Sequence, residues 1–359
     1  MSTINFSKLD RNFDVPEVAD GWAWYDGSKL TIEGRGWADP ETPFARLPPH
    51  AESIVRPPIW SGSRCSTGLV IRFVTDATEI SARWTLISSI LEMNHMPATG
   101  VSGLDLYVWD IDRWRWIGLG RPNKPNEINQ EGPLTTGLRT GEKVFQLYLP
   151  LYNGVQNVQL GIPKENSIRS APRPPEQTRP ICFYGTSIVQ GGCASRPGMA
   201  YTAILGRRLD RPTINLGFSG QGKMDLEIAP LLGELDAAAY VLDALPNMTA
   251  ELVVERAHKF IEILRHARPK TPIILVEGIT RQRAPMQEPS QHEHTLKNAA
   301  LRTVYNALKE SGYENVWLVP GDTLLGDDGD GTVDGTHATD LGFKRMADAI
   351  EPTLRTALA

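Results

Sequence analysis

The pattern of hydrophobic and polar residues changes character near residue 175 of this chain. From about residue 15 to residue 170, short stretches alternate between apolar and polar positions, and Gly, Pro, Asn and Asp separate them. Alternation with a period of two is typical of half-buried antiparallel strands. Many such strands without a helical period predict a β-sandwich of the jelly-roll type. The clearest predicted strands span residues 69–74, 79–86, 104–109, 114–119, 143–149 and 157–162.

After a proline-rich connection at residues 171–176, apolar strands alternate with helical patterns. The clearest helix spans residues 250–267, where apolar residues recur at helical spacing. Two more helices are predicted over residues 295–310 and after Leu341, and Pro352 would kink or shorten the last one. Such alternation predicts a parallel sheet with helices on both faces. Its predicted strands span residues 181–184, 213–216, 238–243, 273–277 and 316–319.

This change of pattern divides the chain into two predicted domains. A chain of 359 residues is longer than one typical domain. The proline-rich stretch is the best candidate for the linker, because prolines stiffen a connection between domains. We therefore expect an all-β domain over residues 1–175, with the linker at its end, and an α/β domain over residues 176–359.

Composition and charge exclude several classes of protein. With 22% charged residues and a net charge of -5, the chain has no basic surplus for nucleic acid or an anionic membrane. No stretch approaches the ~18 apolar residues that span a bilayer, and residues 1–15 lack the apolar core of a secretory signal. The cysteines Cys65, Cys182 and Cys193 show no metal-ligand spacing. We expect reduced thiols in a cytoplasmic protein without a metal site.

Candidate chemistry occurs at the end of the first α/β strand, where Ser187 follows Gly185 and Thr186. In open parallel sheets, ligands bind beyond the carboxyl ends of the strands, so this serine lies where a site is expected. A serine hydroxyl is a weak nucleophile and needs a base that a third group orients. Asp334 and His337 are three residues apart, which is one helical turn, so both side chains can face one site. Together the three residues predict a serine hydrolase or an acyltransferase.

Each of these residues also has an ordinary structural interpretation. Residues 185–187 are typical of a turn and a helix cap, and Asp334 and His337 fit an acidic solvated loop before a helix. Residues 328–334 alternate like a calcium loop, but they lack the glycine at the sixth position and the distal glutamate. The nucleophile elbow of the α/β-hydrolases is excluded, because it needs a glycine where this chain has Val189.

Two segments after later strands can supply the oxyanion hole of such a site. A tetrahedral intermediate needs preorganised donors, and the loss of one donor costs about 10²–10³ in rate. Gly220 follows the second strand, and a glycine lets a backbone N–H approach closely. Asn247 follows the third strand, and its side-chain amide can donate. Either segment alone is typical of a turn, but four such segments in order, each after a strand end, favour one site.

At these four positions the chain resembles the SGNH or GDSL hydrolase superfamily, over the whole predicted α/β domain. The resemblance implies a flavodoxin-like three-layer α/β/α fold with a parallel five-stranded sheet. It implies a catalytic triad of Ser187, Asp334 and His337. It also implies an oxyanion hole formed by the backbone N–H groups of Ser187 and Gly220 and the side chain of Asn247.

The first half of the chain carries a second resemblance. Residues 103–107 read Gly-Leu-Asp-Leu-Tyr and are similar to the GxDLY motif of a β-domain fused to one branch of this superfamily. The chain also departs from the wider superfamily. Thr186 stands where most members have aspartate, Leu-Pro-Asn before Met248 replaces Gly-Asn-Asp, and Ala338 replaces a proline. None of these changes removes a reacting group, so they bear on the shape of the pocket.

Other conspicuous residues have structural interpretations. We expect residues 281–294, with His292 and His294, to form a solvated loop, and Cys193 to be a small buried residue. Eight of the nine tryptophans lie in the first third of the chain. Aromatic rings stack on sugars, yet we expect most of them to fill the sandwich core or its seam with the α/β domain, with one or two contacting substrate.

Residues and resemblance together predict a serine esterase for short-chain esters, acetyl esters above all, of a carbohydrate or a small metabolite. The expected partner is a small-molecule or saccharide ester, with no cofactor, no nucleic acid and no membrane. Two alternatives stay open at this stage. One is an acyltransferase that uses the same acyl-enzyme, and the other is a carbohydrate-binding protein whose hydrolase domain is inert. The sequence also leaves open whether the chain forms a homo-oligomer.

Overall fold

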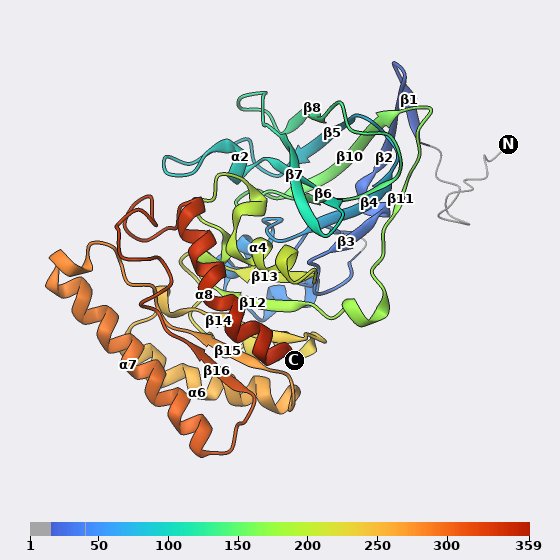
Figure 1. Cartoon of the computed structure of the whole chain (residues 1–359). Helices are drawn as coiled ribbons and strands as arrows, with labels where there is room; N and C mark the ends of the chain where they lie inside the picture. Colours follow the sequence, from blue (N-terminus) through green and yellow to red (C-terminus); the bar gives the residue numbers. More distant parts are fainter. Residues whose placement is uncertain (1–15, 40) are drawn as a thin grey trace.

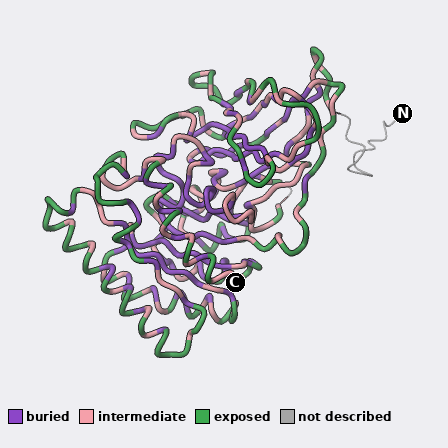
Figure 2. Tube along the Cα trace, in the orientation of Figure 1, coloured by how far each residue is buried: buried purple, intermediate pink, exposed green. Residues whose placement is uncertain are grey.

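The computed structural model describes residues 16–39 and 41–359. The prediction that residues 1–15 are not a secretory signal therefore falls outside the described residues. The chain forms an antiparallel β-sandwich followed by a three-layer α/β/α unit around a parallel sheet, which confirms the predicted fold class (Figure 1). The buried stretches of the chain follow the strands of the three sheets and the inner faces of the helices (Figure 2). Within the described ranges, no helix combines the length and the apolar character that a membrane span requires.

The sandwich consists of two antiparallel sheets. The first contains, in spatial order, β1 (Glu17–Ala19), β2 (Trp22–Asp26), β10 (Val155–Pro163), β5 (Ile80–Leu86) and β8 (Asn129–Thr135). The second contains β11 (Ile168–Ser170), β4 (Val70–Thr75), β9 (Lys143–Tyr148), β6 (Leu104–Asp110) and β7 (Arg113–Gly120), and β3 (Thr31–Glu33) also pairs with β4.

The six strands expected from alternation are all present in the sandwich. On β5, every second residue from Ile80 to Leu86 is buried, as a period of two requires. Trp84 on this face is 1% exposed, and its Nε1 donates to the Ser102 carbonyl at 3.1 Å. The strands that the pattern does not reveal are short or irregular, and β8 contains both Gly132 and Pro133, which weaken the signal of a strand.

The parallel sheet has the order β13 (Thr213–Gly217), β12 (Ile181–Gly185), β14 (Ala239–Asp243), β15 (Ile273–Val276) and β16 (Val316–Val319). This is the flavodoxin-like order, in which the first strand of the unit lies between the second and the third. Residues alternate between the two faces: Tyr240 and Leu242 join one core, whereas Ala239 and Val241 join the other. The carboxyl end of β12 therefore lies at the switch point of the sheet, where ligands bind.

Helices cover both faces of this sheet (Figure 1). Buried residues of α5, α6 and α7 belong to one core, and those of α4 and α8 belong to the other. The α-helices are α1 (Pro57–Ser63), α2 (Ala98–Val101), α3 (Ser187–Gln190), α4 (Tyr201–Arg208), α5 (Ile228–Glu234), α6 (Ala250–Ala267), α7 (Glu288–Glu310) and α8 (Asp340–Leu358). The 3-10 helices are η3 (Gly27–Lys29), η4 (Pro49–Ser53), η5 (Pro175–Gln177), η6 (Pro197–Met199), η7 (Leu245–Asn247) and η8 (Ala284–Met286).

One segment of the first half of the chain completes the core of the α/β unit. Leu47 and Ile59, 4% and 0% exposed, belong to the same hydrophobic cluster as α5 and α6. Beside them, the buried guanidinium of Arg46 donates to the carbonyls of Asn215 and Gly217 at 3.1 and 2.6 Å, at the end of β13. The α/β unit is thus built from residues on both sides of the proline-rich connection.

Two predictions about the last helices are wrong. Helix α7 begins at Glu288, so His292 and His294 lie on its first turns instead of in a solvated loop. The segment reads as a loop because most of its residues are exposed and polar. Helix α8 runs through Pro352 to Leu358 and is not shortened. Its buried face packs on the sheet and outweighs the hydrogen bond that a proline removes.

Candidate active site

Ser187 is the first residue of α3, immediately beyond the carboxyl end of β12. The Thr186 hydroxyl caps the helix by accepting the Ile188 N–H at 3.2 Å, so threonine serves here as the N-cap. Gly191 ends the helix with a left-handed φ of 96°. Ser187 is buried, with 7% of its surface exposed. A short capped helix therefore fixes the hydroxyl at the switch point of the sheet.

The structure brings together the three side chains expected to form a triad. Ser187 Oγ lies 2.9 Å from His337 Nε2, and His337 Nδ1 lies 2.7 Å from Asp334 Oδ2. Asp334 and His337 lie in a turn and not on a helix. The prediction that one helical turn separates them is therefore wrong, although their side chains do meet. Gly335, with a φ of 86°, makes this turn, which a residue with a side chain would strain.

Asp334 is held as a carboxylate by its neighbours. Its Oδ1 accepts the backbone N–H groups of Thr336 and His337 at 3.0 and 2.8 Å. Partial burial favours the neutral acid, but these bonds and the His337 ring outweigh it and lower the pKa of Asp334 to about 2. An ionised Asp334 at neutral pH orients the imidazole with its Nδ1–H toward the carboxylate and its Nε2 toward Ser187.

The two residues expected to hold the oxyanion lie beyond neighbouring strands. Gly220 lies in a turn after β13 with a φ of 69°, and this turn joins β12 through the Phe218 N–H, which donates to the Gly185 carbonyl at 2.9 Å. Asn247 ends η7 after β14, and its buried Nδ2 has no hydrogen-bond partner among the residues that the structure describes. An unpaired buried amide is costly, which is expected where a donor awaits a ligand.

The β-sandwich reaches the site with residues that the sequence does not reveal. Tyr152, between β9 and β10, donates its hydroxyl to the Ser187 carbonyl at 3.2 Å. His95, in the loop before α2, has its ring centroid 5.6 Å from that of His337. Neither residue belongs to a recognisable motif, and both lie far from Ser187 in the sequence. No pattern of spacing could have assigned them to the site.

The Gly-Leu-Asp-Leu-Tyr motif anchors the loop that follows Ser187. Asp105 is fully buried and accepts hydrogen bonds of 2.8 Å from Arg196 Nη1, the Gly198 N–H and Trp116 Nε1. Burial raises the pKa of Asp105, and the positive charge of Arg196 opposes this rise. Gly103 is needed because a Cβ there would lie 2.4 Å from the Thr99 carbonyl oxygen.

A second buried carboxylate lies at the end of β14. Asp243 is 1% exposed, and its Oδ2 accepts a 3.0 Å hydrogen bond from the Tyr201 hydroxyl, whereas its Oδ1 has no hydrogen-bond partner within residues 16–39 and 41–359. Burial raises its pKa to about 7, although the Tyr201 bond acts in the opposite direction. Asp243 is therefore largely protonated below neutral pH.

Cys193, His294 and Asp328 have surroundings that fit structural roles. Cys193 is 5% exposed, and burial, followed by the charge of Asp334, raises the pKa of its thiol to about 12, so it is not a nucleophile at neutral pH. His294 accepts or donates at Thr280, 3.1 Å away, while Asp328 in the acidic loop pairs with Arg345 at 2.6 Å.

The tryptophans of the first third lie mainly in the core or at the seam. Trp24, Trp84 and Trp114 are buried, and Trp114 Nε1 donates to Asp210 of the α/β unit at 3.1 Å. Trp116 is 49% exposed, although its Nε1 is bonded to Asp105.

Comparison with known proteins covers both halves of the chain. Residues 178–355 match the GDSL-like lipase/acylhydrolase family, and residues 22–168 match the N-terminal domain of SGNH-hydrolase-type esterases. The structure is similar to that of a GDSL-like lipase from Bacteroides ovatus, with a TM-score of 0.88 and 32% identity over 94% of this chain and 98% of the other. No curated protein matches the chain.

Two more distant structures share the fold. The salicylyl-acyltransferase SsfX3 of a tetracycline biosynthetic pathway has a TM-score of 0.74 and 18% identity over 94% of this chain and 98% of its own. A family two carbohydrate esterase from Clostridium thermocellum, solved with cellohexaose, has a TM-score of 0.59 and 16% identity over 81% and 93% of the two chains. Both similarities extend over the sandwich as well as the parallel sheet.

Proposed function

Because this chain belongs to the GDSL-like lipase/acylhydrolase family and is a carboxylic ester hydrolase, we propose that it is a serine esterase that removes short acyl groups, acetyl above all, from a carbohydrate or a small metabolite. The observation that carries the proposal is the hydrogen-bond chain from Ser187 Oγ through His337 to Asp334, with separations of 2.9 and 2.7 Å. These distances are within the reach that a nucleophile and its base require.

In the proposed reaction, His337 Nε2 takes the proton of Ser187 as Oγ attacks the ester carbonyl. The developing oxyanion accepts hydrogen bonds from the N–H groups of Ser187 and Gly220 and from Asn247 Nδ2. The first N–H groups of a helix have no partner within the helix, so the Ser187 N–H at the start of α3 can serve. His337 then gives its proton to the departing alcohol, and the acyl-enzyme forms.

Hydrolysis of the acyl-enzyme reverses these roles. Water loses a proton to His337 Nε2 and attacks the acyl carbon, and Ser187 leaves with that proton as the acid is released. Asp334 stays ionised throughout, because its pKa of about 2 is far below the working pH. Its contribution is to orient the imidazole and to stabilise the imidazolium that forms twice in each cycle.

The preference for a short acyl group is supported by the close packing around the nucleophile. A Cβ at Gly192 would lie 2.7 Å from the Tyr152 hydroxyl and 3.2 Å from His337 Cδ2, so no spare space exists there. The His95 ring lies beside the His337 ring and adds to this packing. We propose a saccharide as the alcohol part of the ester, because this chain shares its fold with the carbohydrate esterase solved with cellohexaose.

The test is the hydrolysis of p-nitrophenyl acetate by wild type, by Ser187→Ala and by Ser311→Ala, whose exposed serine follows α7. We expect Ser187→Ala to lose about 10⁴-fold or more in kcat, with Ser311→Ala unchanged. Longer p-nitrophenyl esters and a panel of acetylated sugars then rank the acyl and alcohol groups. Equal rates in all three proteins would contradict the proposal, and rates no higher than the uncatalysed background would favour the inert carbohydrate-binding protein.

An acyltransferase is the second candidate, and the fold shared with SsfX3 along nearly the whole chain supports it. The same acyl-enzyme would form, and an acceptor alcohol would replace water in the second step. Adding sugar or polyol acceptors to the ester assay and measuring the ratio of transferred to hydrolysed acyl group separates the two activities.

The functional unit in this proposal is the whole chain. We divide it at residue 175 into a sandwich and a hydrolase domain, but residues 46–59 pack into the hydrolase core. Tyr152 and His95 of the sandwich also flank Ser187 and His337. The sandwich therefore takes part in forming the active site as well as in stabilising the fold.

A further inference from the structure

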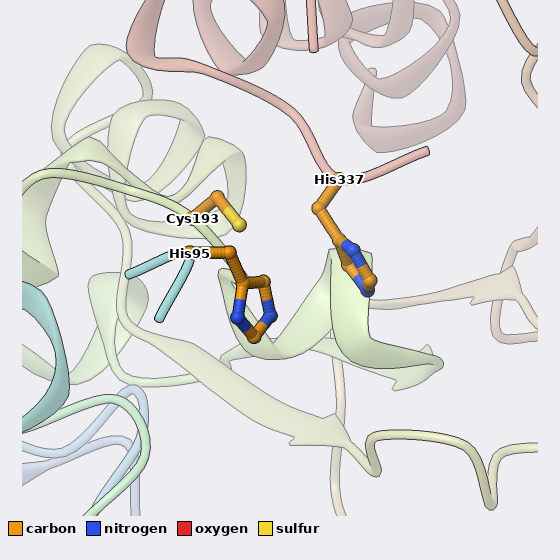
Figure 3. A group of neighbouring side chains, drawn as sticks. All are labelled: His95, Cys193 and His337. Atoms are coloured by element: carbon orange, nitrogen blue, oxygen red, sulfur yellow. The ribbon is translucent and has the colours of Figure 1, made fainter. Parts of the chain in front are cut away.

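His95, Cys193 and His337 form a group of side chains that the proposed ester hydrolysis uses only in part. One ligand atom from each residue, a ring nitrogen or the sulfur, lies within 4.8 Å of the other two. His95 comes from the sandwich, Cys193 from the loop after α3, and His337 from the turn before α8 (Figure 3). Two imidazoles and a thiol are ligands that Zn²⁺ prefers, whereas Mg²⁺ and Ca²⁺ prefer oxygen.

Both histidines are oriented as zinc-binding histidines usually are. His337 Nδ1 is held by Asp334 Oδ2 at 2.7 Å, and His95 Nδ1 lies 2.9 Å from Asn94 Oδ1. An oxygen acceptor on one ring nitrogen leaves the other nitrogen free to bind a metal, and such partners are typical of zinc sites. In both rings the nitrogen left for the metal is Nε2.

The third ligand is held in place by its backbone. Cys193 has a φ of 75°, a left-handed conformation that is uncommon for a residue with a side chain. Next to it, the Gly192 N–H donates to the Ser187 carbonyl at 2.8 Å, and the Ser195 carbonyl accepts the Thr99 hydroxyl at 2.6 Å. The Thr99 bond joins this loop to the same part of the sandwich that carries His95.

From this geometry we infer that His95, Cys193 and His337 bind Zn²⁺ reversibly and that zinc inhibits the enzyme. Zinc bonds of about 2.0–2.3 Å place tetrahedral ligand atoms about 3.3–3.6 Å apart. From separations of up to 4.8 Å, the ligand atoms must therefore approach one another by about 1 Å when the metal binds. Water completes the fourth position, and the Cys193 thiol releases its proton to solvent as the zinc–sulfur bond forms.

Inhibition follows from the position of His337 and rests on the proposed function. Its Nε2 is 2.9 Å from Ser187 Oγ, and the same lone pair cannot accept the serine proton while it binds a metal. Zinc binding and general-base catalysis therefore exclude each other. The metal acts here as a ligand that competes with the reaction.

The first test is zinc inhibition of ester hydrolysis by the full chain, freed of metal with a chelator and kept reduced with a phosphine. We expect Zn²⁺ to inhibit wild type, excess EDTA to restore the activity, and Mg²⁺ to have no effect. In Cys193→Ser and in His95→Gln, the inhibitory zinc concentration should rise by about tenfold to a hundredfold or more, relative to the zinc-free rate of each variant. Cys65→Ser and His292→Gln are matched controls and should keep wild-type sensitivity.

The second test does not depend on activity. Co²⁺ bound by a thiolate gives a charge-transfer absorption band, which we expect in wild type, in Ser187→Ala and in Cys65→Ser but not in Cys193→Ser. If hydrolysis is never observed, this band still tests the metal site, so failure of the proposed function and failure of the metal site are distinguishable. Absence of the band in wild type, or equal zinc sensitivity of wild type and Cys193→Ser, would overturn the inference.

Discussion

The carboxylate of Asp105 in the β-sandwich accepts a 2.8 Å hydrogen bond from Arg196 in the loop that follows Ser187. The same carboxylate holds the Gly198 N–H, and the loop between Ser187 and Gly198 contains Cys193. The acidic residue of the Gly-Leu-Asp-Leu-Tyr motif therefore holds the loop after Ser187, which borders the proposed active site.

Replacing Asp105 by alanine should destabilise the protein strongly. The change leaves Arg196 and the Gly198 N–H without their acceptor, and breaking such a buried pair costs about 3–5 kcal/mol. Asp110→Ala is the matched control, because Asp110 ends the same strand but pairs with the half-exposed Arg115, where the loss is about 1 kcal/mol or less. Urea unfolding of both variants measures the difference, and equal losses would contradict the anchoring role.

Replacing Asn247 by alanine should reduce activity without reducing stability. Its Nδ2 makes no hydrogen bond to the described part of the chain, so the substitution removes none there. The oxyanion would lose one donor, which lowers kcat by about 10²–10³. Asn298→Ala is the contrast, because Asn298 accepts the Gly278 N–H at 2.9 Å and its loss should cost about 1–3 kcal/mol. Steady-state kinetics and thermal unfolding of both variants test this, and unchanged kcat in Asn247→Ala would exclude it from the oxyanion hole.

Replacing Asp334 by asparagine should lower kcat by about 10⁴-fold, because the amide can present a donor to His337 Nδ1 and favour the wrong tautomer. The difference in stability between wild type and Asp334→Asn should also depend on pH. The pKa of Asp334 is lowered to about 2 in the folded protein, so its stabilising effect is complete above the unfolded pKa near 4. This effect is lost as the pH falls toward 2.

We expect wild type to exceed Asp334→Asn in stability by about 1 kcal/mol or less at pH 7, because the Asp334 side chain is 40% exposed. The difference should vanish near pH 2. Guanidinium unfolding at several pH values measures it, and a difference that grows on acidification would show that the sign is wrong.

The difference in stability between wild type and Asp243→Asn should have the opposite pH dependence. The pKa of Asp243 is raised to about 7, so the folded state keeps a proton that the unfolded chain releases near pH 4. Wild type therefore loses stability as the pH rises from about 4 to 7, on the order of 3–4 kcal/mol, whereas the neutral amide does not.

The stability of Asp243→Asn should thus be similar to that of wild type near pH 4 and higher at pH 8. Calorimetry between pH 4 and pH 8 measures how the two stabilities separate. Asp236→Asn, which changes an exposed acidic residue, is the control and should follow wild type throughout. A constant difference between wild type and Asp243→Asn from pH 4 to pH 8 would contradict a buried protonated carboxyl group.

The fold was predictable because each of its main elements carries a local signal. Helix α6 (Ala250–Ala267) has the predicted bounds, since its buried residues recur at helical spacing over its whole length. The start of α7 was not predictable, because residues 288–294 are polar and mostly exposed, and a polar stretch has no periodicity to read. Short strands such as β3 (Thr31–Glu33) likewise depend on the neighbour with which they pair.

The sequence by itself determined which residues could react: Ser187, Asp334 and His337 follow strands in an order that a parallel sheet gathers at one edge. It did not determine what surrounds them. The positions of His95 and Tyr152 beside these candidate residues, and of Leu47 and Ile59 in the hydrolase core, arise only when the sandwich packs against the parallel sheet. Hydrophobic periodicity records whether a residue is buried, but it does not record which distant segment buries it.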